Sequence, residues 1–306
     1  MKHVAVLMGG WSSERQVSLW SGAACAGALD RTGRYKVSRV DVDRDIAINL
    51  RALKPDCALN LLHGRPGEDG TIQGMLEILG IPYSHSGVMA SAVANQKDIA
   101  KTVLKAAGIP VPGGRLVSRH EAAKAHALPP PYVIKPVAEG SSVGVFIVRE
   151  DMKHPPQELT RADWSFGERV LVEPYIPGKE LTCAVMGDKA LGVIEIVAAT
   201  KFYDYEAKYA PGGSRHLLPA PIPSDVYAEV QRLSLLAHRA LGCRGISRAD
   251  FRYDDGKPGT GSLYCLEVNT QPGMTEVSLV PELAAHAGVG FDELVRWMIE
   301  DASLDL

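Results

Sequence analysis

The first third of the chain alternates apolar strands with helices, and this alternation constrains the fold more than any other feature of the sequence. Strands are predicted over His3–Met8, Tyr35–Val42 and Cys57–Leu62, and helices over about Ser13–Leu29 and Thr71–Leu79. Strand–helix alternation with short links is typical of a parallel sheet with helices on its faces. We therefore expect the chain to begin with a small, open, parallel-sheet α/β domain.

The loop after the first predicted strand, residues 9–12, lacks the G-x-G-x-x-G spacing of a dinucleotide-binding turn. Ser13 and Gln16 have the spacing of a capping box, which predicts that the next helix starts at Ser13. Glu14 lies in the first helical turn, where a carboxylate interacts favourably with the helix dipole. Because ligands also bind at the carboxyl edge of parallel sheets, Glu14 is a candidate binding residue. His63 closes a strand in the same kind of place, although a lone histidine is more often structural.

The rest of the chain is predicted to form two further segments that are richer in strands. The first has a connecting helix at 94–107 and then a strand, a glycine-rich loop and a strand at 132–136, 138–144 and 145–148. The second begins with strands near 179 and continues with a helix at 224–241, a hairpin at 246–269 and a helix at 291–300. We therefore predict an α/β fold, α+β in part, with domains at residues 1–92, 93–178 and 179–306.

The hairpin in the last segment carries the most specific group of polar residues. Glu267 and Asn269 are two positions apart on a strand, so their side chains share one face. A hairpin symmetric about 258–259 pairs Asp250 with Glu267, and two carboxylates with an amide oxygen suit Mg²⁺ that also binds nucleotide phosphates. A polar sheet face is the plainer interpretation. Arg248, on the same face, is predicted either to pair with the carboxylates or to stabilise a developing oxyanion.

The loop Glu139–Gly144 is a second candidate site, and it follows a strand that contains Lys135. Its glycines and serines allow backbone N–H groups to surround an anion, and the lysine adds positive charge. The loop is not a P-loop, because G-x-x-x-x-G-K-[ST] is absent and a strand follows. A plain hairpin turn is the alternative interpretation.

Two other features also have a functional and a plainer interpretation. Segment Phe202–Tyr209 contains three tyrosines and Lys208 before a glycine pair, which suits either a lid that excludes water or a solvated loop. Lys97, Lys101 and Lys105 are four residues apart on one face of a predicted helix. Such a stripe is usually solvated, but one of its members is a candidate phosphate ligand.

The composition excludes several classes of protein. The 33 Lys and Arg residues nearly balance 36 Asp and Glu residues, and the net charge of −3 argues against a nucleic-acid-binding surface. No segment has the roughly 20 consecutive apolar residues of a membrane helix, and we expect no signal peptide. Five dispersed cysteines without a C-x-x-C pair argue against a disulfide framework or a zinc site. We therefore expect a soluble, cytoplasmic protein.

A series of long motifs extends along nearly the whole chain. They are Gly9-Gly10 with Ser13–Arg15, Val17–Leu19, His63–Gly70, Lys135-Pro136 with Glu139–Gly144, Phe202–Tyr209, Glu267–Thr275 and Ser278–Pro281. In this order they resemble the motifs of the ATP-grasp ligases, and within them those of the D-alanine–D-alanine ligase family. One departure is Asn95-Gln96-Lys97, where the family has Met-Asp-Lys. The resemblance implies an ATP-grasp fold after the first domain, with ATP between the second and third domains.

The resemblance also implies a role for each candidate residue. Phosphates would be contacted by Lys97, Lys135 and Lys208, the adenine by Glu173 and Ile176, and the ribose by Glu180. Two Mg²⁺, with Mn²⁺ as an alternative, would be held by Asp250, Glu267 and Asn269. Glu14 would bind the first ammonium group beside Ser141 and Tyr209, His63 and Ser278 would bind substrate, and Arg248 with the Gly273 N–H would face the oxyanion.

The reaction implied is ATP-dependent ligation of two D-alanines through an acyl phosphate, for peptidoglycan precursor synthesis, by a homodimer. Tyr209 favours an amine nucleophile, because relatives that accept D-lactate tend to lack a tyrosine there. Three alternatives are a ligase that joins D-alanine to a hydroxy acid or another amino acid, an inactive nucleotide-binding sensor of D-alanine, and a regulatory or structural protein with the same fold. Arg248 and the intact metal trio argue against the sensor, and the intact lid segment argues against the last alternative.

Overall fold

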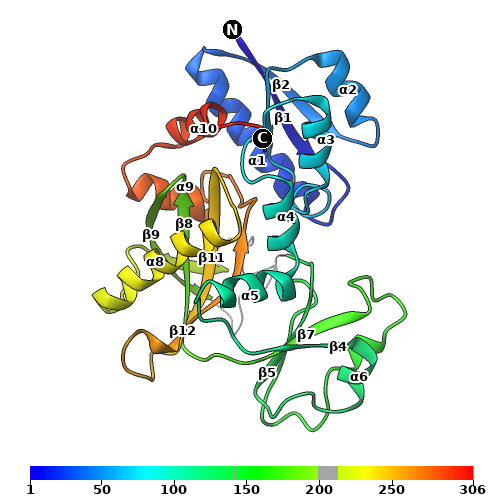
Figure 1. The fold of residues 1–306 in the computed structure, drawn as a ribbon, viewed down its shortest axis with the longest axis vertical. Coiled ribbons are helices and arrows are strands. Elements are labelled where there is room, and N and C mark those ends of the chain that lie inside the picture. The colour runs from blue at the N-terminus through cyan, green and yellow to red at the C-terminus, as the bar shows by residue number, and fades with distance from the viewer. Residues whose placement is uncertain (141, 199–212, 306) are drawn as a thin grey trace.

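The computed structural model describes residues 1–140, 142–198 and 213–305. Their strands form three sheets, and each sheet takes its strands from one continuous part of the chain (Figure 1). The mixed α/β architecture predicted from the sequence is confirmed. Within the described ranges, no helix is long and apolar enough to cross a membrane.

The first sheet is parallel, as predicted, with the strand order β2–β1–β3. It consists of β1 (Lys2–Gly9), β2 (Tyr35–Val42) and β3 (Cys57–Asn60), with helices α1 (Arg15–Thr32), α2 (Ile46–Leu53) and α3 (Thr71–Leu79). Val4 and Val6 of β1 belong to the same buried cluster as α1, whereas Ala5 and Leu7 belong to a cluster with α2 and α3. The apolar run in β1 is continuous because helices cover both faces of the sheet.

The capping box predicted at Ser13 is wrong. Helix α1 begins after Glu14, whose side chain makes no capping bond. The hydroxyl of Ser12 fixes this turn instead, because its Oγ accepts from the Glu14 N–H (3.2 Å) and donates to the His63 carbonyl (2.6 Å). The two loops that carry Glu14 and His63 are therefore joined directly at the carboxyl edge of the sheet.

The connecting helix predicted over 94–107 is two helices, α4 (Val88–Asn95) and α5 (Lys97–Ala106). They are separated at Gln96, whose backbone is extended (φ −97°, ψ 95°). The Lys97 N–H donates to the carbonyl of Val137 (3.0 Å), so the start of α5 is attached to the chain just after β5. Lys97 is thereby the first residue of its helix.

The second sheet is antiparallel, with the order β4–β7–β5–β6. Its elements are β4 (Arg115–Ser118), α6 (Arg119–Lys124), β5 (Tyr132–Pro136), β6 (Phe146–Val148), a 3₁₀ turn (Gln157–Thr160) and β7 (Arg169–Pro174). The predicted strands on both sides of the glycine-rich loop are confirmed.

The third sheet is antiparallel, with the order β10–β9–β8–β11–β12. Its elements are β8 (Lys179–Met186), β9 (Lys189–Ala198), β10 (Ser214–Leu217), α8 (Ser224–Ala240), β11 (Ile246–Tyr253), a 3₁₀ turn (Thr260–Ser262), β12 (Leu263–Asn269), α9 (Leu279–His286) and α10 (Phe291–Glu300). The predicted hairpin is confirmed, including the pairing of Asp250 with Glu267.

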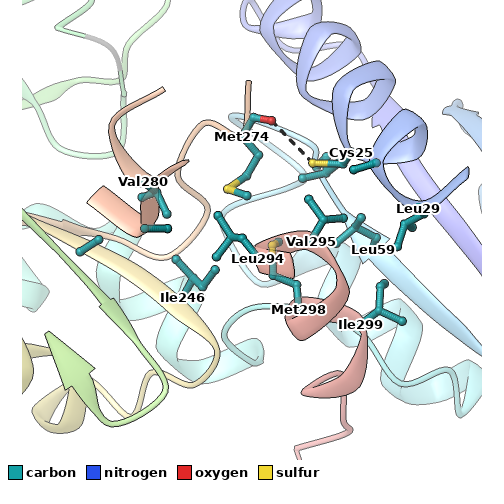
Figure 2. Close-up of a cluster of buried hydrophobic side chains, with 14 of the residues drawn as sticks. Cys25, Leu29, Leu59, Ile246, Met274, Val280, Leu294, Val295, Met298 and Ile299 are labelled. Atoms are coloured by element: carbon teal, nitrogen blue, oxygen red, sulfur yellow. Dashed lines mark hydrogen bonds between the residues drawn. The ribbon is translucent and has the colours of Figure 1, made fainter. Parts of the chain in front are cut away.

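A buried apolar cluster joins the beginning and the end of the chain (Figure 2). Cys25 of α1 and Leu59 of β3 lie in one cluster with Leu294 and Met298 of α10. The Cys25 Sγ is 3.6 Å from the carbonyl oxygen of Met274, which lies in the loop between β12 and α9. The position of this loop, residues 270–278, therefore depends on the first sheet as well as on the third.

Candidate active site

A cavity of about 1070 Å³ is lined by residues from the regions of all three sheets. Every predicted site residue that the structure describes lines this cavity. They are Glu14, His63, Lys97, Lys135, Glu173, Ile176, Glu180, Arg248, Asp250, Glu267, Asn269, Gly273 and Ser278. The predicted lid segment 202–209, with Lys208 and Tyr209, lies outside the described residues, and so does Ser141.

Asp250 receives hydrogen bonds from its own strand, β11, and from the neighbouring strand β8. Arg248 donates from Nε to Oδ1 (2.8 Å) and from Nη2 to Oδ2 (2.7 Å), and Thr182 of β8 donates to Oδ1 (2.6 Å). The predicted pairing of Arg248 with a carboxylate is therefore confirmed, whereas its role toward an oxyanion stays a prediction. The alternation of Arg248, Asp250 and Arg252 along β11 puts all three on one face.

Glu267 and Asn269 extend this polar face onto β12. The Glu267 Oε2 is 3.2 Å from Lys97 Nζ, and Asn269 Oδ1 accepts from the backbone N–H of Gln271 (2.8 Å). An ionised carboxylate has about four lone-pair sites, so the three hydrogen bonds to Asp250 leave acceptor capacity. These hard oxygen donors fit Mg²⁺.

The donor set also indicates how a cation would be held. Across residues 1–140, 142–198 and 213–305, no cluster of three or more His, Cys, Asp or Glu side chains could hold a metal ion. The trio at the hairpin supplies two carboxylates and one amide, which is typical of sites where Mg²⁺ takes further ligands from phosphates. Such a donor set would leave coordination positions open for phosphate oxygens or water.

The lysines beside this face are buried, contrary to the expectation of a solvated stripe. Lys101 and Lys135 both pair with the carboxylate of Glu173, Lys135 at 2.7 Å, and all three residues are under 9% exposed. Lys97 donates to the carbonyl of Glu139 (2.7 Å), and of the stripe only Lys105 is exposed. Burial removes hydration from the ammonium groups, which lowers the pKa of Lys135 to about 8 and also lowers the pKa of Lys101.

Of the predicted adenine and ribose residues, Glu173 lies near the end of β7, Ile176 in the turn that follows and Glu180 at the start of β8. Arg252 fixes this turn, because it donates to the carbonyls of Ile176 (3.1 Å) and Gly178 (2.8 Å) and lies 3.7 Å from the Glu180 carboxylate. The sequence analysis missed Arg252. Its position two residues after Asp250 on an alternating strand was a usable signal.

The substrate end of the cavity lies at the edge of the first sheet. Glu14 is 8% exposed, and a methyl group at Gly64 or Gly140 would lie 3.3 or 3.4 Å from its Oε2. The glycine-rich loop of the second sheet therefore passes beside the carboxylate of Glu14. His63 is 4% exposed and lies 3.5 Å from Glu68, so it is held in a buried polar contact.

The loop between β12 and α9 closes the cavity beside Gly273. The Ser278 hydroxyl accepts from the Thr275 N–H (3.1 Å) and lies 2.7 Å from the Thr275 hydroxyl. A methyl group on Gly273 would lie 3.2 Å from the Ser278 Oγ. Gly273 and Ser278 are therefore neighbours, as the predicted roles in one substrate site require.

Comparisons with known proteins agree with this arrangement. Two family models match, "D-ala D-ala ligase C-terminus" over residues 103–300 and "D-ala D-ala ligase N-terminus" over residues 47–86. The chain is 71% identical over 304 residues to the D-alanine–D-alanine ligase of Azorhizobium caulinodans, which covers 99% of both chains. It is 70% identical over 305 residues to that of Afipia carboxidovorans, covering 100% of this chain and 99% of the relative.

Solved structures show the same relationship. D-alanine–D-alanine ligase from Bacillus anthracis superposes with a TM-score of 0.81 at 34% identity, covering 98% of this chain and 97% of the other. Its complex with ATP superposes with a TM-score of 0.79 at 32% identity, with the same coverage. These neighbours have the ATP-grasp fold, which confirms the predicted fold class. The sequence and structural similarity, over almost the full length, establishes that the chain belongs to the D-alanine–D-alanine ligase family.

Proposed function

We propose that this protein is the ligase that its family membership indicates, an enzyme that joins two D-alanines to D-alanyl-D-alanine at the expense of ATP. The product is a peptidoglycan precursor. The observation that carries the proposal is the single cavity in which the lysines, the hairpin carboxylates, Glu14 and the 270–278 loop converge. A nucleotide and an amino acid bound there would have their reacting groups side by side.

The first step transfers the γ-phosphoryl group of ATP to the carboxylate of one D-alanine, giving an acyl phosphate and ADP. Lys97 and Lys135 neutralise the phosphate charge during transfer, and Lys208 is proposed as a third contact. Glu173 and Ile176 contact the adenine, and Glu180 the ribose. Two Mg²⁺, or Mn²⁺, held by Asp250, Glu267 and Asn269, would supply further charge neutralisation when bound.

The second step forms the peptide bond. The amine of the second D-alanine attacks the acyl carbon, and phosphate leaves from a tetrahedral intermediate. Arg248 and Gly273 both line the cavity, and we assign the Arg248 guanidinium and the Gly273 N–H the stabilisation of the oxyanion. Glu14 binds the ammonium group of the first D-alanine, and His63 and Ser278 bind substrate. Ser141, Tyr209 and the lid segment complete the site and keep water from the acyl phosphate.

The proposal extends to the organisation of the protein. Domains at 1–92, 93–178 and 179–306 are supported by the three sheets, whose strands fall within these ranges. We further propose a cytoplasmic homodimer, since the substrates are cytoplasmic metabolites and related ligases are commonly dimers. Size-exclusion chromatography with light scattering tests the dimer.

The first experiment combines the purified protein with ATP, Mg²⁺ and D-alanine, and follows phosphate release and the dipeptide by mass spectrometry. Parallel reactions contain L-alanine, or D-alanine with D-lactate. A dipeptide formed from D-alanine alone supports the proposal. Phosphate release that depends on D-lactate would identify a depsipeptide ligase, and ATP binding without turnover under all conditions would identify a sensor.

A further inference from the structure

We propose that Asn60 and Gln271 form a positioning pair that sets the place of the Gly273 N–H and of the Asn269 side chain. Asn60 ends β3 of the first sheet, and Gln271 lies two residues after Asn269 and two before Gly273. Neither residue of the pair lines the cavity. This inference rests on the ligase function proposed above and concerns how its oxyanion site is built.

Two buried hydrogen bonds join the residues, one from the Gln271 side chain to the Asn60 backbone and one between the two side chains. The Gln271 Nε2 donates to the Asn60 carbonyl (2.6 Å), and the Asn60 Nδ2 donates to the Gln271 Oε1 (3.0 Å). Asn60 is 0% exposed and Gln271 is 1% exposed. Buried hydrogen bonds of this kind cannot be replaced by water, so removing one partner leaves the other unsatisfied.

The surrounding contacts fix the orientation of both amides. The Asn60 Oδ1 accepts from the Leu62 N–H (3.2 Å), so its Nδ2 must point to the carbonyl of Gly67 (3.1 Å) and to Gln271. The Gln271 Nε2 also lies 3.4 Å from His85 Nδ1. Each donor and acceptor of the pair therefore has a partner, and the pair has one arrangement.

The Gln271 side chain bonds to the backbone of β3, which is an edge strand of the first sheet. On that edge the Ala58 N–H and carbonyl bond to the segment at 82–84, and the Asn60 N–H bonds to the Ser84 hydroxyl (3.0 Å). The next acceptor, the Asn60 carbonyl, is taken by the Gln271 amide. The loop after β12, a strand of the third sheet, is thus attached to β3 at the edge of the first sheet.

The bond between Gln271 and β3 constrains the chain on both sides of Gln271, toward Asn269 and toward Gly273. Its backbone N–H holds the Asn269 Oδ1 at 2.8 Å, which orients a proposed metal ligand. Toward Gly273 the next residue is Pro272, whose ring fixes φ and leaves few torsions free between Gln271 and the Gly273 N–H. The Met274 N–H then bonds to Ser21 of α1 (3.3 Å), so the segment with the oxyanion donor is fixed at both ends.

The test uses Gln271→Met, which keeps the approximate side-chain volume and removes both hydrogen bonds of the Gln271 amide to Asn60. Asn60→Leu is the second variant, and it removes the bond from Asn60 Nδ2 but keeps the backbone carbonyl that accepts from Gln271. Gln73→Met is the matched control. Gln73 is equally buried (1% exposed) and donates to the same Gly67 carbonyl (2.8 Å), but no hydrogen bond joins it to the 270–275 loop among the described residues. For each variant, kcat, KM for ATP and D-alanine, the melting temperature and the ADP-binding stoichiometry are measured, and kcat is expressed per ADP-binding site.

Removal of one oxyanion donor costs about 10²–10³-fold in kcat, and displacement of the donor should cost about 10–100-fold. We expect this loss for Gln271→Met and a smaller loss for Asn60→Leu, which keeps the backbone acceptor, with KM for ATP changed less than about threefold and a kcat of Gln73→Met near that of the native protein. Equal kcat per site in all three variants would overturn the inference. If the Gln271→Met protein does not fold, the same measurements are made on Gln271→Asn, for which we expect the same loss of kcat. Absence of turnover in the native protein would instead contradict the proposed function.

Discussion

The buried contact of Glu173 with Lys101 and Lys135 makes a quantitative prediction about stability. One carboxylate faces the side-chain nitrogens of two lysines, and the three residues are between 2% and 8% exposed. Glu173→Gln keeps the shape of the side chain but removes the negative charge. Breaking a buried ion pair by removal of one partner typically costs about 3–5 kcal/mol, because the remaining charge is desolvated and uncompensated.

We expect Glu173→Gln to lower the free energy of unfolding at pH 7 by about 3–5 kcal/mol, because the buried Lys135 ammonium loses its counter-ion. Lys101→Met should cost less than about 2 kcal/mol, because Lys135 and Glu173 remain as a one-to-one pair and a buried ion can be replaced by an apolar side chain at little cost. Equilibrium urea unfolding measures both changes. Asp163→Asn is the control, since its pair with Arg161 is mostly exposed and should contribute at most about 1 kcal/mol.

The dependence on pH provides a second check. The pKa of Lys135 is already lowered to about 8 by burial, and loss of the carboxylate should lower it further. The lysine pKa in an unfolded chain is about 10.4, so the unfolded variant binds more protons than the folded one. The free energy of unfolding of the variant therefore increases as pH rises. The cost of Glu173→Gln should therefore shrink between pH 7 and pH 9. A cost below 1 kcal/mol at pH 7, or one that grows with pH, would refute this account of the cluster.

Four further predictions concern activity. The kcat/KM for ATP should fall above about pH 8 as Lys135 loses its proton, and Lys135→Arg should shift this fall to higher pH; an unshifted profile would exclude Lys135 as its cause. Arg248→Lys should lower kcat about 10²-fold, since lysine cannot reproduce the two-point contact of the guanidinium, and near-native kcat would contradict its oxyanion role. Glu267→Gln should abolish dipeptide formation without loss of the folded circular dichroism spectrum, and surviving activity would mean that the metal site is elsewhere. Gly140→Ala places a methyl group 3.4 Å from the Glu14 carboxylate and should raise KM for D-alanine but not for ATP; the same KM for D-alanine would separate this loop from the substrate site.

The parts of the fold that could be predicted are those where local pattern and position agree. The apolar run of β1 indicated a parallel strand, and the symmetric turn residues of the last hairpin gave the pairing of Asp250 with Glu267 correctly. In both cases the spacing along the chain determines which side chains meet. The helix break at Gln96 was not predicted, because the contact that holds it, from the Lys97 N–H to the carbonyl of Val137, comes from a distant segment.

The same distinction separates the parts of the site that the sequence indicated from those it did not. Motif residues such as Lys135 and Glu267 were identified because resemblance and chemistry point to them individually. By contrast, Glu173 and Lys101 pair across 72 positions of the sequence and Gln271 and Asn60 across 211. Gln271 lies inside the Glu267–Thr275 motif, but nothing in that motif points to Asn60 as its partner. Both contacts are buried, where an unsatisfied polar group is costly, so each constrains the position of a neighbour that does line the cavity. The residues proposed to perform the chemistry could therefore be identified from the sequence alone, whereas the residues that hold them in place could be identified only from the three-dimensional structure.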